Sequence, residues 1–159
     1  MLHHNVGEKA ARADGIRMLE EVGMPAPARR YDSYTFQLSG GQRQRAMIAM
    51  ALINKPRLLI ADEPTTALDV TTQANILDLL ARLQRDTGMG VLFITHDLGV
   101  VAEIADEVAV VFCGKIVEGG AGGGGVGEPQ QPYYGGLAVS VPRLRGGVLF
   151  LFLFLIRRR

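Results

Sequence analysis

The sequence predicts an α/β fold with a mostly parallel core sheet and helices on both faces. Residues 57–61 and 91–95 are two short apolar runs, and polar residues follow each of them at once. The stretch between them has apolar residues at the spacing of one buried helix face: Ile76, Leu77, Leu80 and Leu83. Strands that alternate with helices form parallel sheets, because each helix returns the chain across the sheet.

Two further helices are expected before the first strand. Residues 9–22 carry apolar side chains at three-residue steps, which predicts an amphipathic helix. Residues 43–54 contain an almost unbroken apolar run that stops before Pro56. Such a run predicts a helix that is buried on most of its circumference.

The turn before this second helix is predicted to contact a phosphate group. Adjacent glycines let a backbone approach an anion closely, and a serine before a helix caps the N-terminus, whose N–H groups face the anion. In isolation, Ser-Gly-Gly also occurs in ordinary loops. The residues of this turn are Leu38, Ser39, Gly40, Gly41 and Gln42.

Acidic residues and a histidine follow the two predicted strands. Asp62 is expected to hold Mg²⁺ through water, and Glu63 to position the water that attacks a γ-phosphate. His96 can donate a hydrogen bond to a phosphate oxygen. Asp69 precedes the next helix, which it can cap whether or not it has a second role. Taken singly, Asp62 and Glu63 could mark only a polar turn after a strand, and His96 could have only a structural role.

In this order the motifs resemble those of the nucleotide-binding subunits of ATP-binding cassette (ABC) transporters. Residues 38–42 are similar to the family signature, residues 58–62 to Walker B, and residues 67–69 to the D-loop. The resemblance implies a P-loop NTPase fold with part of a helical signature subdomain, and ATP and Mg²⁺ as cofactors. It implies that Glu63 and His96 are catalytic, that Asp62 holds the metal, and that the nucleotide is bound by Leu38, Ser39, Gly40, Gly41, Gln42 and Asp69.

Residues 29–34, 42–49, 129–134 and 140–142 resemble the importers of dipeptides, oligopeptides and nickel. This implies ATP-driven uptake of such solutes by a peripheral subunit at the cytoplasmic face of the inner membrane. The partners implied are a second ATP-binding subunit, permease subunits and, indirectly, a solute-binding protein. No Gly-x-x-x-x-Gly-Lys-Ser/Thr phosphate loop occurs in the sequence, so an incomplete fold from the C-terminal part of a longer subunit is expected.

Two other functions stay open at this point. One is a soluble ABC ATPase of DNA repair or translation, and the other is an inactive fragment. A net charge of +1 does not favour a nucleic-acid partner. The single cysteine, Cys113, excludes an internal disulfide framework and offers no clustered metal site.

The sequence divides into four regions. Residues 1–118 are expected to form the ATPase portion, with a helical subdomain over 8–55 and the strand-bearing part over 56–118, which ends in a hairpin around residues 113–114. Residues 119–128 are predicted to be a glycine-rich linker, and residues 129–145 an importer-type extension.

Residues 146–159 form a tail of unknown role. Its apolar run, residues 148–156, is shorter than the roughly 20 residues that a membrane-spanning helix needs. An interfacial segment, a partner contact and an aggregation-prone strand all fit the alternation of leucine and phenylalanine. Removal of residues 148–159 is expected to improve solubility and to leave the nucleotide chemistry unchanged.

Overall fold

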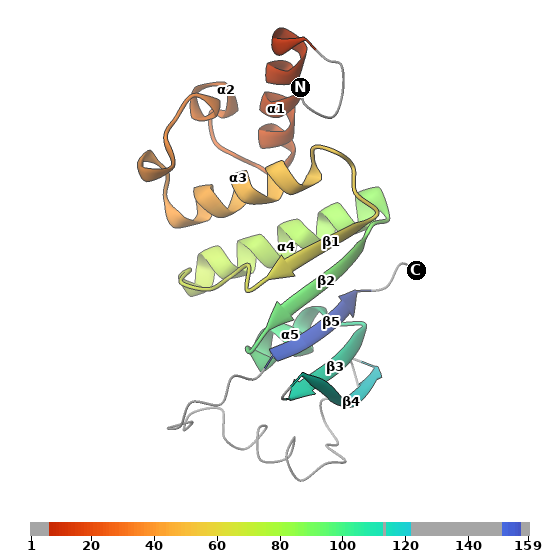
Figure 1. Cartoon of the computed structure of the whole chain (residues 1–159). Helices are drawn as coiled ribbons and strands as arrows, with labels where there is room; N and C mark the ends of the chain where they lie inside the picture. Colours follow the sequence, from red (N-terminus) through yellow and green to blue (C-terminus); the bar gives the residue numbers. More distant parts are fainter. Residues whose placement is uncertain (1–6, 113, 122–150, 157–159) are drawn as a thin grey trace. The chain divides into compact units, whose positions relative to one another are not determined.

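The computed structural model describes residues 7–112, 114–121 and 151–156 (Figure 1). These residues form two compact units: a helical unit within residues 1–59 and 65–86, and a sheet unit within residues 60–64 and 87–159. In chain order the elements are α1 (Glu8–Glu21), α2 (Pro27–Tyr31), the 3₁₀ helix η1 (Thr35–Gln37), α3 (Gly40–Leu52), β1 (Leu58–Asp62), α4 (Val70–Thr87), β2 (Gly90–Thr95), α5 (Leu98–Ile104), β3 (Glu107–Phe112), β4 (Lys115–Ala121) and β5 (Leu151–Ile156).

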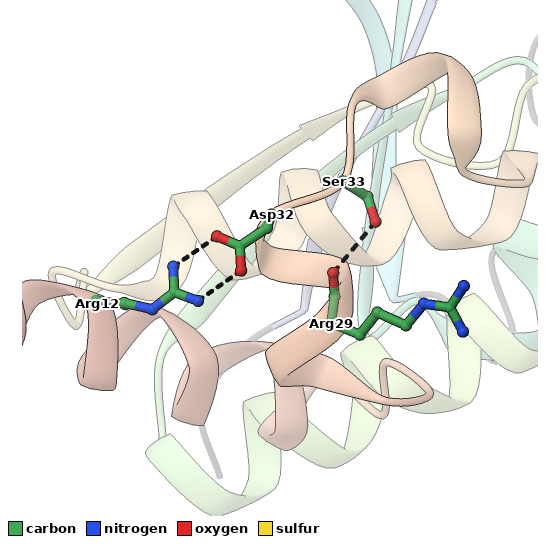
Figure 2. Close-up of polar contacts among 4 residues, drawn as sticks. All are labelled: Arg12, Arg29, Asp32 and Ser33. Atoms are coloured by element: carbon green, nitrogen blue, oxygen red, sulfur yellow. Dashed lines mark hydrogen bonds and ion pairs between the residues drawn. The ribbon is translucent and has the colours of Figure 1, made fainter.

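In the helical unit, α1 holds α2 through a bidentate ion pair (Figure 2). The two guanidinium nitrogens of Arg12 donate to the two carboxylate oxygens of Asp32 at 2.6 and 2.5 Å. The same guanidinium lies 4.8 Å from the ring centroid of Tyr31. The hydroxyl of Ser33 donates to the carbonyl oxygen of Arg29 at 3.3 Å. These contacts fix the segment that leads toward α3.

Helix α3 begins earlier and is less buried than the sequence predicted. Ser39 caps it, as expected, and Gly40 is its first residue. Its buried residues are Ile48, Ala49 and Leu52, whereas Met50 is 74% exposed. The prediction that α3 is buried on most of its circumference was therefore wrong. An unbroken apolar run has no periodicity, so it does not show which face of the helix is covered.

The sheet has the strand order β1-β2-β5-β3-β4. Strand β5 is antiparallel to both of its neighbours, with Phe154 opposite Phe93 of β2 and Val108 of β3. Strands β2 and β3 consequently run in the same direction, as β1 and β2 do in Figure 1. The predicted mostly parallel sheet is wrong. The sheet is mixed, because residues 151–156 enter between two parallel strands and the β3–β4 hairpin returns antiparallel.

Three local differences from the sequence-based expectations concern strands and a helix. Strand β1 was expected to be fully buried, but Leu58 and Ile60 are exposed and only its other face is covered. Strand β4 continues to Ala121, so the first residues of the predicted linker belong to the sheet.

Helix α5 was not predicted. Asp97 caps it by accepting hydrogen bonds from the N–H groups of Gly99 and Val100. The remaining linker, the importer-type extension and Cys113 lie outside the described residues.

Buried apolar residues occur in both units. In the sheet unit, Val91, Phe93, Val101 and Val110 are almost completely buried. In the helical unit, the predicted face of α4 is confirmed: Ile76, Leu77, Leu80 and Leu83 are all buried. None of the helices in the described part of the chain has the length and apolarity that a membrane crossing requires.

Candidate functional site

Residues 38–42, which we call the glycine turn, are held as a helix N-terminus by a reciprocal capping box. The Ser39 Oγ accepts from the Gln42 N–H at 3.3 Å, and the Gln42 side-chain oxygen accepts from the Ser39 N–H at 3.2 Å. Arg43 donates to the carbonyl oxygen of Leu38 at 2.7 Å. In the part of the chain that the structure describes, the N–H groups of Gly40 and Gly41 find no internal acceptor. They are available to an anion.

Residues 67–69, which we call the aspartate turn, lie against the glycine turn within the helical unit. A Cβ added at Gly40 would lie 3.3 Å from Cδ2 of Leu68, and one added at Gly41 would lie 2.7 Å from Cγ2 of Thr72. Ala67 has a φ of 62°, in the left-handed region that a non-glycine residue rarely adopts. The structure therefore brings the two predicted nucleotide-binding motifs of this unit together.

Asp69 is the N-cap of α4. Its carboxylate accepts hydrogen bonds from the N–H of Thr72 at 2.9 Å and from the Thr72 hydroxyl at 2.7 Å. The hydroxyl bond is the main reason that the pKa of Asp69 lies below its ordinary value, and the backbone bond adds to the effect. The capping role expected from the sequence is confirmed. A nucleotide contact by Asp69 stays a prediction.

Glu63 and His96 meet in the sheet unit. The Glu63 Oε1 lies 2.8 Å from the His96 Nδ1. The N–H of Glu63 donates to the carbonyl oxygen of Ile94 at 2.9 Å, which ties the end of β1 to β2. Glu63 has a φ of 44°, so its backbone is held in a sparsely populated conformation. Strained backbone of this kind clusters at functional sites.

The contact restricts how His96 can act. With Glu63 ionised, the proton of the imidazole lies on Nδ1, between the two side chains. The Nε2 atom then accepts a hydrogen bond when the ring is neutral and donates one when the ring is protonated. His96 is 60% exposed, so Nε2 is accessible to a ligand.

Asp62 lies exposed at the carboxyl end of β1, next to Glu63. Among the described residues there is no group of three or more side chains suited to holding a metal ion. In proteins, Mg²⁺ can be bound by one carboxylate ligand together with water and substrate phosphates. Asp62 has the right chemistry for that single ligand.

Sequence reasoning missed two residues that shape these turns, Arg43 and Thr72. Arg43 holds the turn by donating a hydrogen bond to the carbonyl oxygen of Leu38. The signal for Thr72 was present, since an aspartate followed three residues later by threonine fits an N-cap and its third helical residue. Its contact with Gly41 depends on how two helices pack, which no local pattern reveals.

Comparison with known proteins gives a consistent family. The ABC transporter family model matches residues 2–66. The dipeptide transport ATP-binding protein DppD of Bacillus subtilis (strain 168) is 55% identical over 89% of this chain and 42% of its own length. The glutathione import ATP-binding protein GsiA of Pectobacterium atrosepticum is 55% identical over 90% of this chain and 23% of its own.

Solved structures agree with the sequence relatives. The ATP-binding cassette MJ0796, in a dimeric post-hydrolysis state bound to ADP and phosphate, has a TM-score of 0.64 and 30% identity. The alignment covers 75% of this chain and 50% of that one. The chain thus spans less than half the length of the curated relatives that it matches.

Proposed function

We propose that the chain, which is similar to ABC transporter ATP-binding proteins over most of its length, belongs to that family and acts in an ATP-binding subunit that energises the import of peptide-like solutes. The observation that carries this proposal is the 2.8 Å contact between Glu63 and His96. It joins the two side chains with the chemistry for water activation and phosphate recognition, from the ends of two neighbouring strands. The capped glycine turn supplies a second, separate anion-facing element.

The glycine turn binds nucleotide that is held by a partner subunit. The N–H groups of Gly40 and Gly41 point from a helix N-terminus, where the helix dipole favours negative charge. The Ser39 hydroxyl accepts a bond from Gln42, which leaves its own proton to donate to a phosphate oxygen. Closure of this turn on a γ-phosphate completes a site between two subunits.

Glu63 positions and deprotonates the attacking water at a nucleotide that its own subunit holds. His96 orients the Glu63 carboxylate through Nδ1, and when its ring is protonated its Nε2–H donates a hydrogen bond to a phosphate oxygen. Asp62 is the residue that would hold Mg²⁺. When bound, the metal neutralises charge on the phosphate oxygens. A phosphate loop, absent from the 159 residues, is needed for this second site.

The proposed permease contact is an exposed aromatic pair in the helical unit. The rings of Tyr34 and Phe36 stack with centroids 5.5 Å apart, although the residues are 70% and 79% exposed. Contiguous exposed apolar patches often mark interaction sites, and aromatic side chains are enriched at protein interfaces. They support a peripheral subunit that docks on membrane partners at the cytoplasmic face.

The solute class follows from the relatives. DppD is named for dipeptides and GsiA for glutathione, so we assign this chain to the importers of short peptides and related solutes. Uptake of nickel-like solutes stays a prediction. A solute-binding protein is then an indirect partner. The described residues offer no observation that favours the DNA-repair or translation alternative.

Calorimetry with Mg²⁺-ATP tests the proposal. The chain is titrated alone and in a mixture with a peptide-importer cassette that carries a phosphate loop, and the matched control is the same mixture with the G41D variant. We expect additional binding heat only in the mixture with the unaltered chain. Equal heats with the G41D variant would contradict the role of the glycine turn. Tight binding by the chain alone would show that another group replaces the phosphate loop.

A further inference from the structure

Thr72 bridges the glycine turn and the aspartate turn. Its Cγ2 is the atom that a Cβ at Gly41 would meet at 2.7 Å, a distance that real Cβ atoms essentially never show. Its hydroxyl and N–H both bond to the Asp69 carboxylate. One side chain therefore contacts both motifs within the helical unit.

The Thr72 side chain is restrained from moving out of this contact. Threonine is branched at Cβ, so its methyl and hydroxyl groups turn together about χ1. Rotation that would withdraw Cγ2 from Gly41 would also withdraw Oγ1 from Asp69. The methyl contact and the hydroxyl bond are thus coupled in one rotamer.

We propose that Thr72 is a positioning residue that locks the glycine turn to the aspartate turn, so that both reach a partner's nucleotide as one block. This inference rests on the proposed function. Leu68 extends the same contact, since its Cδ2 lies 3.3 Å from the position of a Cβ at Gly40. Glycine at position 41 then has two effects: it leaves room for the Thr72 methyl group, and it lets phosphate approach the backbone.

The competing interpretation assigns the glycines to phosphate approach alone. The two interpretations differ in the protein without nucleotide. If Thr72 locks the turns, G41A strains the isolated chain, and removal of Cγ2 by T72S relieves that strain while it keeps the hydroxyl. T72V keeps the branch and loses the hydroxyl, so it gives no relief. If the glycines serve phosphate alone, the substitutions at position 72 do not alter the effect of G41A.

The first measurement is the melting temperature of the full chain without nucleotide. We expect G41A to lower it by several degrees, because the added Cβ overpacks the contact with Thr72. The G41A/T72S double variant should recover most of the loss, and G41A/T72V should not. G7A is the control, because a Cβ at Gly7 meets nothing within 4 Å. A G41A variant that melts like G7A, or a double variant without recovery, overturns the proposal.

The second measurement is the Mg²⁺-ATP-dependent dissociation constant for a peptide-importer cassette that carries a phosphate loop. T72A should weaken this association by about tenfold or more. T71A, the same change at an exposed neighbour, should leave it within about threefold. Equal effects of T72A and T71A overturn the positioning role. If the unaltered chain does not associate, the proposed function fails, and the lock between the turns is decided by the melting temperatures alone.

Discussion

Asp32 and Asp69 are exposed carboxylates whose pKa values lie below the ordinary value. The guanidinium of Arg12 is the main cause at Asp32, and the hydroxyl of Thr72 at Asp69. Both groups regain a pKa near about 3.9 when the chain unfolds. Because the folded pKa is depressed, the stability that they contribute is complete above the unfolded pKa and is lost as pH falls through the folded pKa.

We therefore expect the urea midpoint to drop below about pH 4. In the D32N/D69N variant this drop should be smaller, since asparagine still caps a helix but does not titrate in this range. The measurement is a series of urea unfolding curves between neutral and strongly acidic pH. An identical pH dependence in both proteins would show that the two contacts do not form in solution.

Gly15 is a second residue whose size is set by a neighbour. A Cβ at this position would lie 2.5 Å from Cε2 of Tyr31. Tyr31 is 40% exposed and can shift, so we expect G15A to cost about 1 kcal/mol, at the low end of overpacking penalties. Urea denaturation of G15A beside G7A measures it. A G15A midpoint equal to that of G7A would mean that α1 and α2 do not pack in this way.

How much of the site could be predicted from the sequence depends on the range of each interaction. The Ser39 cap, the Asp69 cap and the buried face of α4 follow from residues three or four positions apart, and all three are confirmed. The Glu63–His96 pair could be inferred because two predicted strands end in polar residues. The Thr72–Gly41 contact could not, because it depends on the packing of α3 and α4.

At the scale of elements, β5 changes the expected behaviour of the tail. Its register with β2 and β3 fills the space between two parallel strands. Removing residues 148–159 would leave two facing strand edges unpaired, and unpaired edges promote aggregation. The structure therefore argues against the improved solubility expected from the sequence. Pairing between segments so distant in the sequence gives no local pattern, which is why the tail could not be placed in the sheet.

We expect the 148–159 deletion to lower the melting temperature and to increase light scattering on heating. L153P tests the same point with a single residue, because proline lacks the N–H group that a central strand donates. L153P should lower the free energy of unfolding by at least about 1 kcal/mol, the net contribution of one hydrogen bond. The loss should be larger than that caused by L153A, which keeps the N–H group. A deletion variant that is both more soluble and equally stable would refute the placement of β5.

The stacked aromatic residues Tyr34, which precedes η1, and Phe36, which lies within it, lead to a prediction for partner binding. We expect Y34A/F36A to weaken binding to permease subunits by about tenfold, because exposed aromatic anchors dominate many interfaces. The melting temperature should hardly change, since both residues are largely exposed. Co-purification with the permease from membranes measures the binding. Full binding by the variant would place the permease contact elsewhere.

At the scale of the whole molecule, the proposed function predicts that the role of the glycine turn can be tested separately from the role of the Glu63–His96 pair. Under that proposal the glycine turn serves a partner's nucleotide, whereas the Glu63–His96 pair serves a nucleotide held by its own subunit. A peptide-importer cassette with a phosphate loop but a disabled signature cannot hydrolyse ATP as a homodimer. Adding this chain supplies the missing signature and should restore turnover at one composite site.

Substitutions in this chain then have opposite outcomes in the complementation assay. G41D should abolish the restored turnover, because a side chain and a negative charge replace an N–H-lined approach to phosphate. E63Q should leave it unchanged, since the partner's own glutamate acts at the composite site. The chain alone should show no Mg²⁺-dependent turnover above background. Loss of restored activity in E63Q, or turnover by the chain alone that E63Q removes, would mean that this chain hydrolyses ATP at its own site without the phosphate loop.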